Sequence, residues 1–213
     1  MNQEERQLER RVFDFSEHPD LAPRIDGSDD SRVIIGYAIV FNQNSRVLYD
    51  KASRSAFTEV IERGAVDIDF LNAQDIKLNF NHNNDHILGR SMAGHGTLSY
   101  EIDDYGVRFR CELPNTSVGN DVLEMIRRGD VSGCSFAFTY AKDGFRDEKK
   151  GGEKYRTVTR FGSIDDFAIV VDPAYWGTFV CTRAFQEPSA ADDKPAGMPA
   201  GQRMELLRLQ GIL

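Results

Sequence analysis

The sequence predicts a mainly β protein with a few helices, an α+β fold in which six or seven strands close into a barrel and the helices pack outside it. Two observations support this prediction. Apolar residues recur at every second position in one segment after another, which is the period of a half-buried strand. Only two segments carry apolar residues at helical spacing. A chain of 213 residues is long enough for one such domain with tails.

Seven segments carry the strand pattern and are bounded by residues that favour turns. In chain order they are Val33–Phe41, Asp75–His82, Leu98–Ile102, Val107–Leu113, Val131–Tyr140, Tyr155–Phe161 and Phe167–Val171. The sequence Asp-Asp-Tyr-Gly at 103–106 joins the third segment to the fourth. We therefore expect these two strands to form a hairpin.

Two segments are predicted to be helices outside the barrel. Ala56–Arg63 has apolar residues on one helical face and is followed by Gly64. Ser117–Arg128 has the same pattern and is followed by Gly129. Glycine directly after a helix favours the left-handed conformation that ends it.

The chain divides by composition into three parts. Residues 1–31 are mostly polar and are predicted to be a partly flexible arm with one strand near Val12–Phe15. The compact domain, the β-barrel, is predicted to span residues 12–185. Residues 186–213 open with a stretch rich in Pro, Ala, Gly and Asp and are predicted to be a flexible tail.

Charge and cysteine content exclude several classes of protein. The net charge of −8 argues against general binding to nucleic acid, which needs clustered Lys and Arg. Three scattered cysteines without a CxxC pair indicate neither a disulfide framework nor a zinc site. The charged N-terminal residues lack the apolar run of a signal peptide, and no apolar run reaches membrane-spanning length. We therefore expect no cofactor, metal, nucleic acid or membrane partner.

Three residues could form a nucleophilic site. If the strand alternation through Asp75–His82 continues to its end, His82 faces the same way as the apolar residues. Ser135 shares a strand face with small residues, which leaves room for a substrate backbone. Asp166 opens an apolar strand, where a carboxylate needs a partner. That partner is either a cation such as Arg160, in a salt bridge, or a histidine that Asp166 orients. The residues permit a Ser-His-Asp triad and leave structural roles open.

Five segments in this order resemble the prohead proteases of tailed bacteriophages, a family related to the herpesvirus assemblins. The segments are GYAIVF at 36–41, SAF at 55–57, NHN at 81–83 with LGR at 88–90, VSGCSFAF at 131–138, and Asp166 with PAY at 173–175.

The resemblance implies a barrel like that of the herpesvirus protease, and a serine endopeptidase that cleaves scaffold and capsid-protein segments and often trims itself. It implies that Ser135 is the nucleophile, His82 the base and Asp166 the orienting acid, at a position where the family usually has Glu. It places the protein in the host cytoplasm, inside the assembling prohead, with the major capsid protein and scaffold as partners. Association between copies of the chain is left open.

Two other functions fit the same residues. One is a capsid scaffold or assembly protein that uses the barrel without catalysis. The other is a metal-dependent hydrolase with His82, Asp85 and His86 as ligands, although a four-residue spacing brings two rings together on a helix rather than on a strand.

Overall fold

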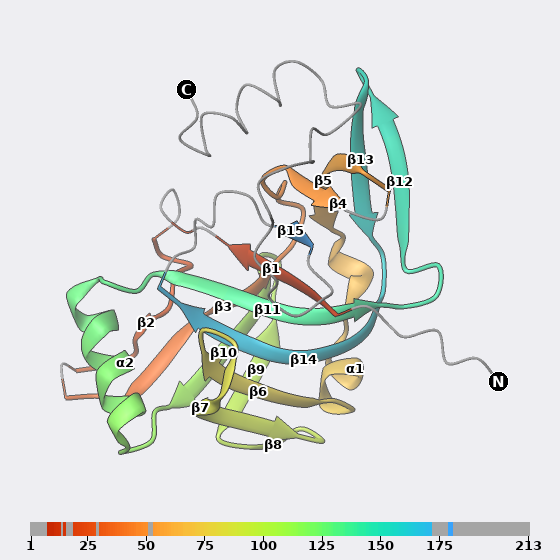
Figure 1. Ribbon diagram of the computed structural model, residues 1–213. Coiled ribbons are helices and arrows are strands. Elements are labelled where there is room, and N and C mark those ends of the chain that lie inside the picture. The colour runs from red at the N-terminus through yellow and green to blue at the C-terminus, as the bar shows by residue number, and fades with distance from the viewer. Residues whose placement is uncertain are drawn as a thin grey trace, which may run out of the picture.

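The computed structural model describes residues 8–13, 15, 19–28, 30–50, 53–171 and 179–180. Within these residues the chain forms fifteen strands, two α-helices and one short 3-10 helix. The protein is therefore mainly β with few helices, as the sequence predicts (Figure 1). The predicted tail, residues 186–213, lies outside the described residues, as does the PAY segment at 173–175.

The largest sheet has six strands in the order β1-β11-β14-β6-β7-β8. Only the pair β14–β6 is parallel. The six strands lie side by side across the middle of Figure 1, with β1 at one edge. Their bounds are Glu9–Phe13 for β1, Asp75–Phe80 for β6, Asn83–Met92 for β7, His95–Gly96 for β8, Gly133–Tyr140 for β11 and Phe161–Val170 for β14.

Two smaller sheets pack around this one. The four-stranded sheet, in the order β2-β3-β10-β9, comprises Arg24–Ile25, Val33–Val40, Gly106–Glu112 and Leu98–Ile102. It contains the predicted hairpin, β9 with β10, which is confirmed. The five-stranded sheet, in the order β12-β13-β5-β4-β15, comprises Phe145–Lys150, Glu153–Val158, Ser55–Ile61, Leu48–Asp50 and Phe179–Val180. Its hairpin β12–β13 projects from the body of the molecule (Figure 1).

The predicted closed barrel of six or seven strands is not found, because none of the three sheets closes on itself within the described residues. Strand alternation predicts which face of a strand is buried, but it does not predict how the sheet edges meet. Open sheets packed on one another bury an apolar face as well as a closed barrel does.

One predicted helix is confirmed and the other is wrong. Helix α2 spans Ser117–Arg128 and ends at Gly129, whose φ of 76° is left-handed. The segment predicted as the helix Ala56–Arg63 instead forms β5, with Phe57, Glu59 and Ile61 buried at every second position. A glutamate at a buried strand position hid this alternation from the sequence. The short helix α1, Ile68–Asn72, was not predicted.

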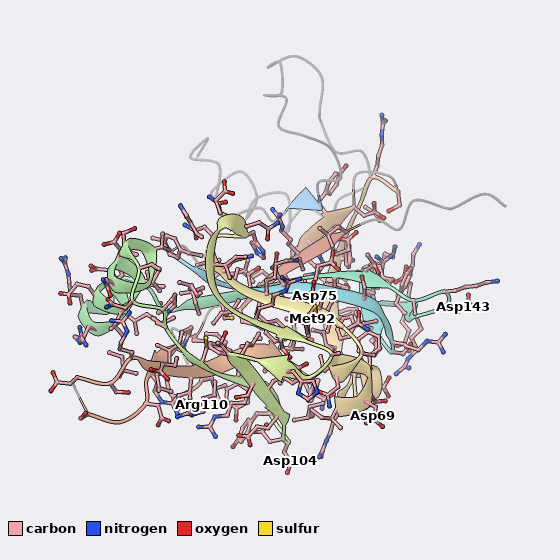
Figure 2. The ribbon with its side chains drawn as sticks, turned by 90° about the horizontal axis from the view of Figure 1, so that it is seen from below. Asp69, Asp75, Met92, Asp104, Arg110 and Asp143 are labelled. Atoms are coloured by element: carbon pink, nitrogen blue, oxygen red, sulfur yellow. The ribbon has the colours of Figure 1, made fainter. Side chains whose placement is uncertain are left out.

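The core lies between the sheets and is rich in aromatic residues. The rings of Phe136, Phe138 and Phe161 lie 4.9–5.8 Å apart between centroids. Charged side chains such as Asp69, Asp104 and Asp143 point away from the sheets (Figure 2). No helix in the described part of the chain is long and apolar enough to cross a membrane.

Candidate functional site

Ser135 lies in the middle of β11, where it pairs with Val12 of β1 on one side and Ala168 of β14 on the other. Because side chains alternate along a strand, Ser135 points away from the face that carries Phe136. Its side chain has no exposed surface. Its hydroxyl lies 2.8 Å from the backbone carbonyl oxygen of Arg11, to which it can donate a hydrogen bond.

His82 is not on a strand. Strand β6 ends at Phe80, and Asn81 and His82 form a two-residue turn into β7, with Phe80 paired to Asn83. Both turn residues have positive φ, 54° and 56°, as a type I′ hairpin requires. The expectation that strand alternation orients His82 is therefore wrong, because the turn sets its direction.

Asn81 holds this turn against the end of β14. Its backbone N–H donates to the carbonyl of Ile169 at 2.9 Å, and its side-chain oxygen accepts the N–H of Val171 at 3.3 Å. A left-handed conformation costs a residue other than glycine roughly 1–2 kcal/mol, and asparagine tolerates it better than most. These two hydrogen bonds offset part of that cost.

The turn brings His82 between Ser135 and Asp166. Its Nε2 lies 2.6 Å from Ser135 Oγ, and its Nδ1 lies 2.7 Å from Asp166 Oδ1. Asp166 is 7% exposed and comes from β14, so the three side chains are supplied by two neighbouring strands and one turn. Arg160, the other predicted partner of Asp166, instead donates to the carbonyl of Lys142.

This arrangement can transfer a proton. When His82 carries its proton on Nδ1 and donates it to Asp166, Nε2 is free to accept the proton of Ser135. The serine hydroxyl has one proton and two acceptors within reach, Nε2 of His82 and the carbonyl of Arg11. Donation to His82 prepares Oγ for attack on a carbonyl carbon, whereas donation to Arg11 does not.

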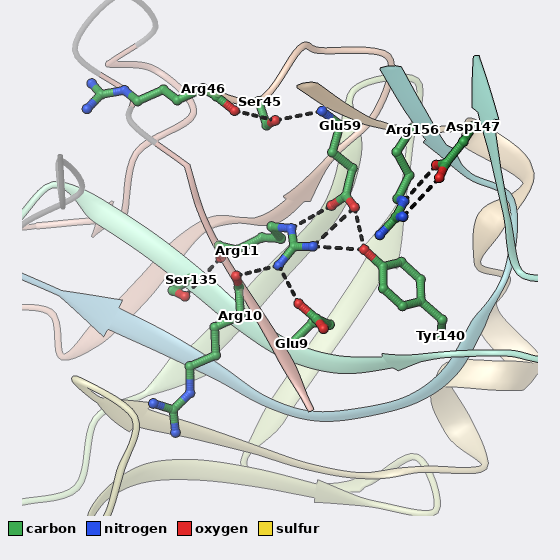
Figure 3. Close-up of polar contacts among 10 residues, drawn as sticks. All are labelled: Glu9, Arg10, Arg11, Ser45, Arg46, Glu59, Ser135, Tyr140, Asp147 and Arg156. Atoms are coloured by element: carbon green, nitrogen blue, oxygen red, sulfur yellow. Dashed lines mark hydrogen bonds and ion pairs between the residues drawn. The ribbon is translucent and has the colours of Figure 1, made fainter. Parts of the chain in front are cut away.

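The side chain of Arg11 lies on the opposite face of the sheet, in a group that we call the Arg11 cluster: Arg11, Glu9 and Glu59, which are buried, and Tyr140, which is half-buried (Figure 3). Arg11 donates to Glu59 through Nε at 2.6 Å and through Nη2 at 3.1 Å, and to Glu9 at 3.1 Å. Tyr140 accepts from Arg11 at 2.8 Å and donates to Glu59 at 2.5 Å.

The cluster sets one guanidinium against two carboxylates, and burial raises the pKa of the Glu9 carboxyl. Burial acts to lower the pKa of Arg11, but the charge of Glu59 and the other neighbouring groups outweigh it, so the pKa rises above its usual value. Burial raises the pKa of Tyr140, which keeps its phenol protonated as a donor. Nothing in the sequence of Glu9–Phe13 indicated that this strand would pair with the one that bears Ser135.

Other candidate groups lie outside the site. Cys134 is fully buried on the opposite face from Ser135, and burial raises its pKa, so its thiol stays protonated. No three His, Cys, Asp or Glu side chains in the described ranges are grouped so that they could hold a metal ion. His82, Asp85 and His86 therefore do not form the alternative metal site.

Comparison with known proteins gives one match. A family model described as caudovirus prohead serine protease matches residues 20–190. No curated protein and no solved structure matches the chain. The matched region contains the segments that carry His82, Ser135 and Asp166, but it begins after β1.

Proposed function

The chain belongs to the caudovirus prohead serine protease family, and from that premise we propose that it cleaves capsid-protein and scaffold segments inside the assembling phage shell, with Ser135 as its nucleophile. The membership makes it a serine protease of phage capsid maturation. The proposal adds the residues that carry the reaction and the substrates on which it acts.

The single observation that supports the assignment is the continuous hydrogen-bonded chain from Ser135 through His82 to Asp166, at 2.6 and 2.7 Å. Serine is a weak nucleophile unless a base takes its proton, and the base needs a partner that fixes its tautomer. In this proposal His82 takes the proton of Ser135, and Asp166 fixes the tautomer of His82.

In the proposed reaction Ser135 Oγ attacks the peptide carbonyl carbon while its proton passes to Nε2 of His82. Asp166 stabilises the imidazolium that forms. His82 then gives the proton to the leaving amine, and the C–N bond breaks to leave an acyl-enzyme. Water, activated by His82 in the same way, hydrolyses the ester and restores Ser135.

Access to the nucleophile requires movement. Ser135 has no exposed surface, and the side chains of His82 and Asp166 are each 10% exposed. A peptide carbonyl can reach Oγ only after a neighbouring segment is displaced. We therefore expect turnover on extended, flexible segments of capsid and scaffold proteins, which can follow that movement more readily than a folded domain can.

Co-expression with the cognate major capsid protein and scaffold tests the proposal. The Ser135→Ala variant should leave these proteins at full length, with activity lower by about 10⁴-fold or more. The matched control is Ser132→Ala, since Ser132 lies on an exposed position before the strand and should process normally. Wild-type processing by Ser135→Ala would refute the assignment. A scaffold role without catalysis predicts full-length proteins with the wild-type chain as well.

Self-cleavage is a second part of the proposal, and it concerns residues 186–213. The Pro-, Gly- and Ala-rich composition of this segment suits entry into an active site. Intact-mass measurement of purified wild type and Ser135→Ala should show a shorter wild-type chain. Identical masses would remove self-cleavage from the proposal and leave the cleavage of capsid proteins untouched.

A further inference from the structure

Asn79 is an unusual residue of the six-stranded sheet. It lies on β6, three residues before His82, and has no exposed surface. Among the residues that the structure describes, neither its side-chain nitrogen Nδ2 nor its oxygen Oδ1 has a hydrogen-bond partner. A buried polar group without a partner costs about 1–3 kcal/mol, so such a residue needs an explanation.

Its position in the register places it on the face of the site. Asn79 pairs with Ala168, and Ala168 pairs with Ser135. Directly paired residues point to the same side of a sheet, so Asn79 and Ser135 flank Ala168 on one face. Asp166, two residues before Ala168, belongs to that face as well.

Asp166, on the same face, has one carboxylate oxygen that can accept a further hydrogen bond. Its Oδ1 is engaged by His82, but no residue in the described ranges donates a hydrogen bond to its second oxygen, Oδ2. Lys77 of β6 is paired directly with Asp166, yet the ion pairs of the described residues do not include one between them. A buried carboxylate is stabilised by each hydrogen bond that it accepts.

Asn79 and Asp166 are diagonal neighbours on adjacent strands, because Lys77 lies beside Asp166 and Asn79 beside Ala168. Diagonal neighbours have Cα atoms about 7–8 Å apart. Two short polar side chains span that separation through one water. Nδ2 of Asn79 is a buried donor, and Oδ2 of Asp166 has room to accept a further hydrogen bond.

We propose that Asn79 is a positioning residue of the protease, whose Nδ2 is linked by one bridging water to Oδ2 of Asp166 and so fixes the carboxylate that orients His82. The inference rests on the proposed Ser135–His82–Asp166 triad and extends it by a fourth residue. A carboxylate held at both oxygens cannot rotate away from Nδ1, which keeps the His82 proton on Nδ1 and leaves Nε2 free as the base.

The test replaces Asn79 by leucine, which has nearly the same size and no polar atom. Asn79→Leu should unfold at nearly the same urea concentration as wild type, because the hydrogen bond that is lost offsets the burial of a carboxamide that is removed. Its kcat should fall roughly 10-fold at unchanged KM, the effect of losing one hydrogen bond to a charged group. ¹⁵N NMR of the His82 ring should show a mixture of tautomers in place of one.

Asn79→Asp sharpens the test, because it keeps the shape and an acceptor but loses the donor and adds a charge beside Asp166. It should lose more activity than Asn79→Leu. Asn120→Leu, at an exposed site on α2, is the control and should change neither kcat nor the NMR spectrum. Lys77→Met tests the rival donor at the position of β6 that is paired with Asp166.

The inference is overturned if Asn79→Leu keeps wild-type kcat and a single His82 tautomer, or if Lys77→Met causes these changes and Asn79→Leu does not. Failure of the proposed function looks different. In that case Ser135→Ala itself would remain active, whatever the Asn79 variants do.

Discussion

Two buried polar groups lie back to back on strands β1 and β11, and they differ in what surrounds them. On one face Ser135 has the small neighbour Ala168 and a base held by a strained turn. On the other face the Arg11 cluster pairs one guanidinium with two carboxylates through ion pairs and hydrogen bonds. The hydroxyl of Ser135 can donate its proton either to His82 or to the carbonyl of Arg11, so it can change partners. In the Arg11 cluster the hydroxyl of Tyr140 donates to Glu59.

The difference indicates that the two faces of this pair of strands have separate roles, one in stability and one in the reaction. The Arg11 cluster holds β1 in register, and a shift by one residue would turn the guanidinium to the wrong face. The register in turn places the carbonyl of Arg11 beside Ser135. We therefore expect changes at the site to alter rate with little effect on stability, and changes in the cluster to alter stability first.

The largest expected effect on rate concerns the histidines. His82→Ala should abolish cleavage, with a loss of about 10⁴-fold or more, because the base is removed. His86→Ala and His95→Ala should retain most activity, since neither ring contacts Ser135 or Asp166. Cleavage of the capsid protein by each purified variant measures the difference. Equal damage from His86→Ala would require a different base.

Asp166→Asn should reduce kcat by about 10³-fold, less than removal of the base, because an orienting group leaves a residual rate when it is lost. Asp165→Asn, at the exposed position next to it, is the matched control and should be nearly silent. We expect Asp166→Glu to keep measurable activity, since the resembling family usually has Glu there. A fully active Asp166→Asn would mean that the enzyme works as a Ser-His dyad.

The cluster should respond in the opposite way. Arg11→Met should lower the free energy of unfolding by about 3–5 kcal/mol, because Glu59 and Glu9 lose the charge that compensates them in the interior. Urea denaturation measures this loss. Replacing both carboxylates by glutamine in the same chain should recover much of it. The comparison fails if Arg11→Met is as stable as Ser135→Ala.

The smallest expected effect concerns the turn at Asn81 and His82, between β6 and β7. Asn81→Ala should lose about 1–2 kcal/mol of stability and several-fold in kcat, because alanine resists the left-handed conformation and lacks the acceptor for Val171. Asn81→Asp keeps both properties and should rescue kcat. Asn81→Gly separates them, since it keeps the conformation alone. Equal kcat in all three variants would show that the turn does not position His82.

The sequence by itself determined the features that depend on neighbouring residues. Alternation in 98–112 specified a hairpin, and the apolar face of 117–128 with Gly129 specified a helix and its end. The same local patterns marked Ser135 and Asp166 as candidates, whereas the alternation used for His82 ends at Phe80 and the resemblance of five segments assigned the three roles. Each of these signals is complete within one or two turns or strands, so no distant contact was needed to detect it.

Only the tertiary structure decided the features that depend on distant partners. Glu59 can occupy a buried strand position because Arg11, 48 residues away, neutralises it, so 55–61 is a strand and not the predicted helix. His82 is directed by a turn that is tied to Ile169 and Val171, not by the alternation of its strand. The burial of a charge and the left-handed conformation of a histidine are both unfavourable locally. They occur because contacts from other strands compensate them, and a linear sequence does not reveal which strands those are.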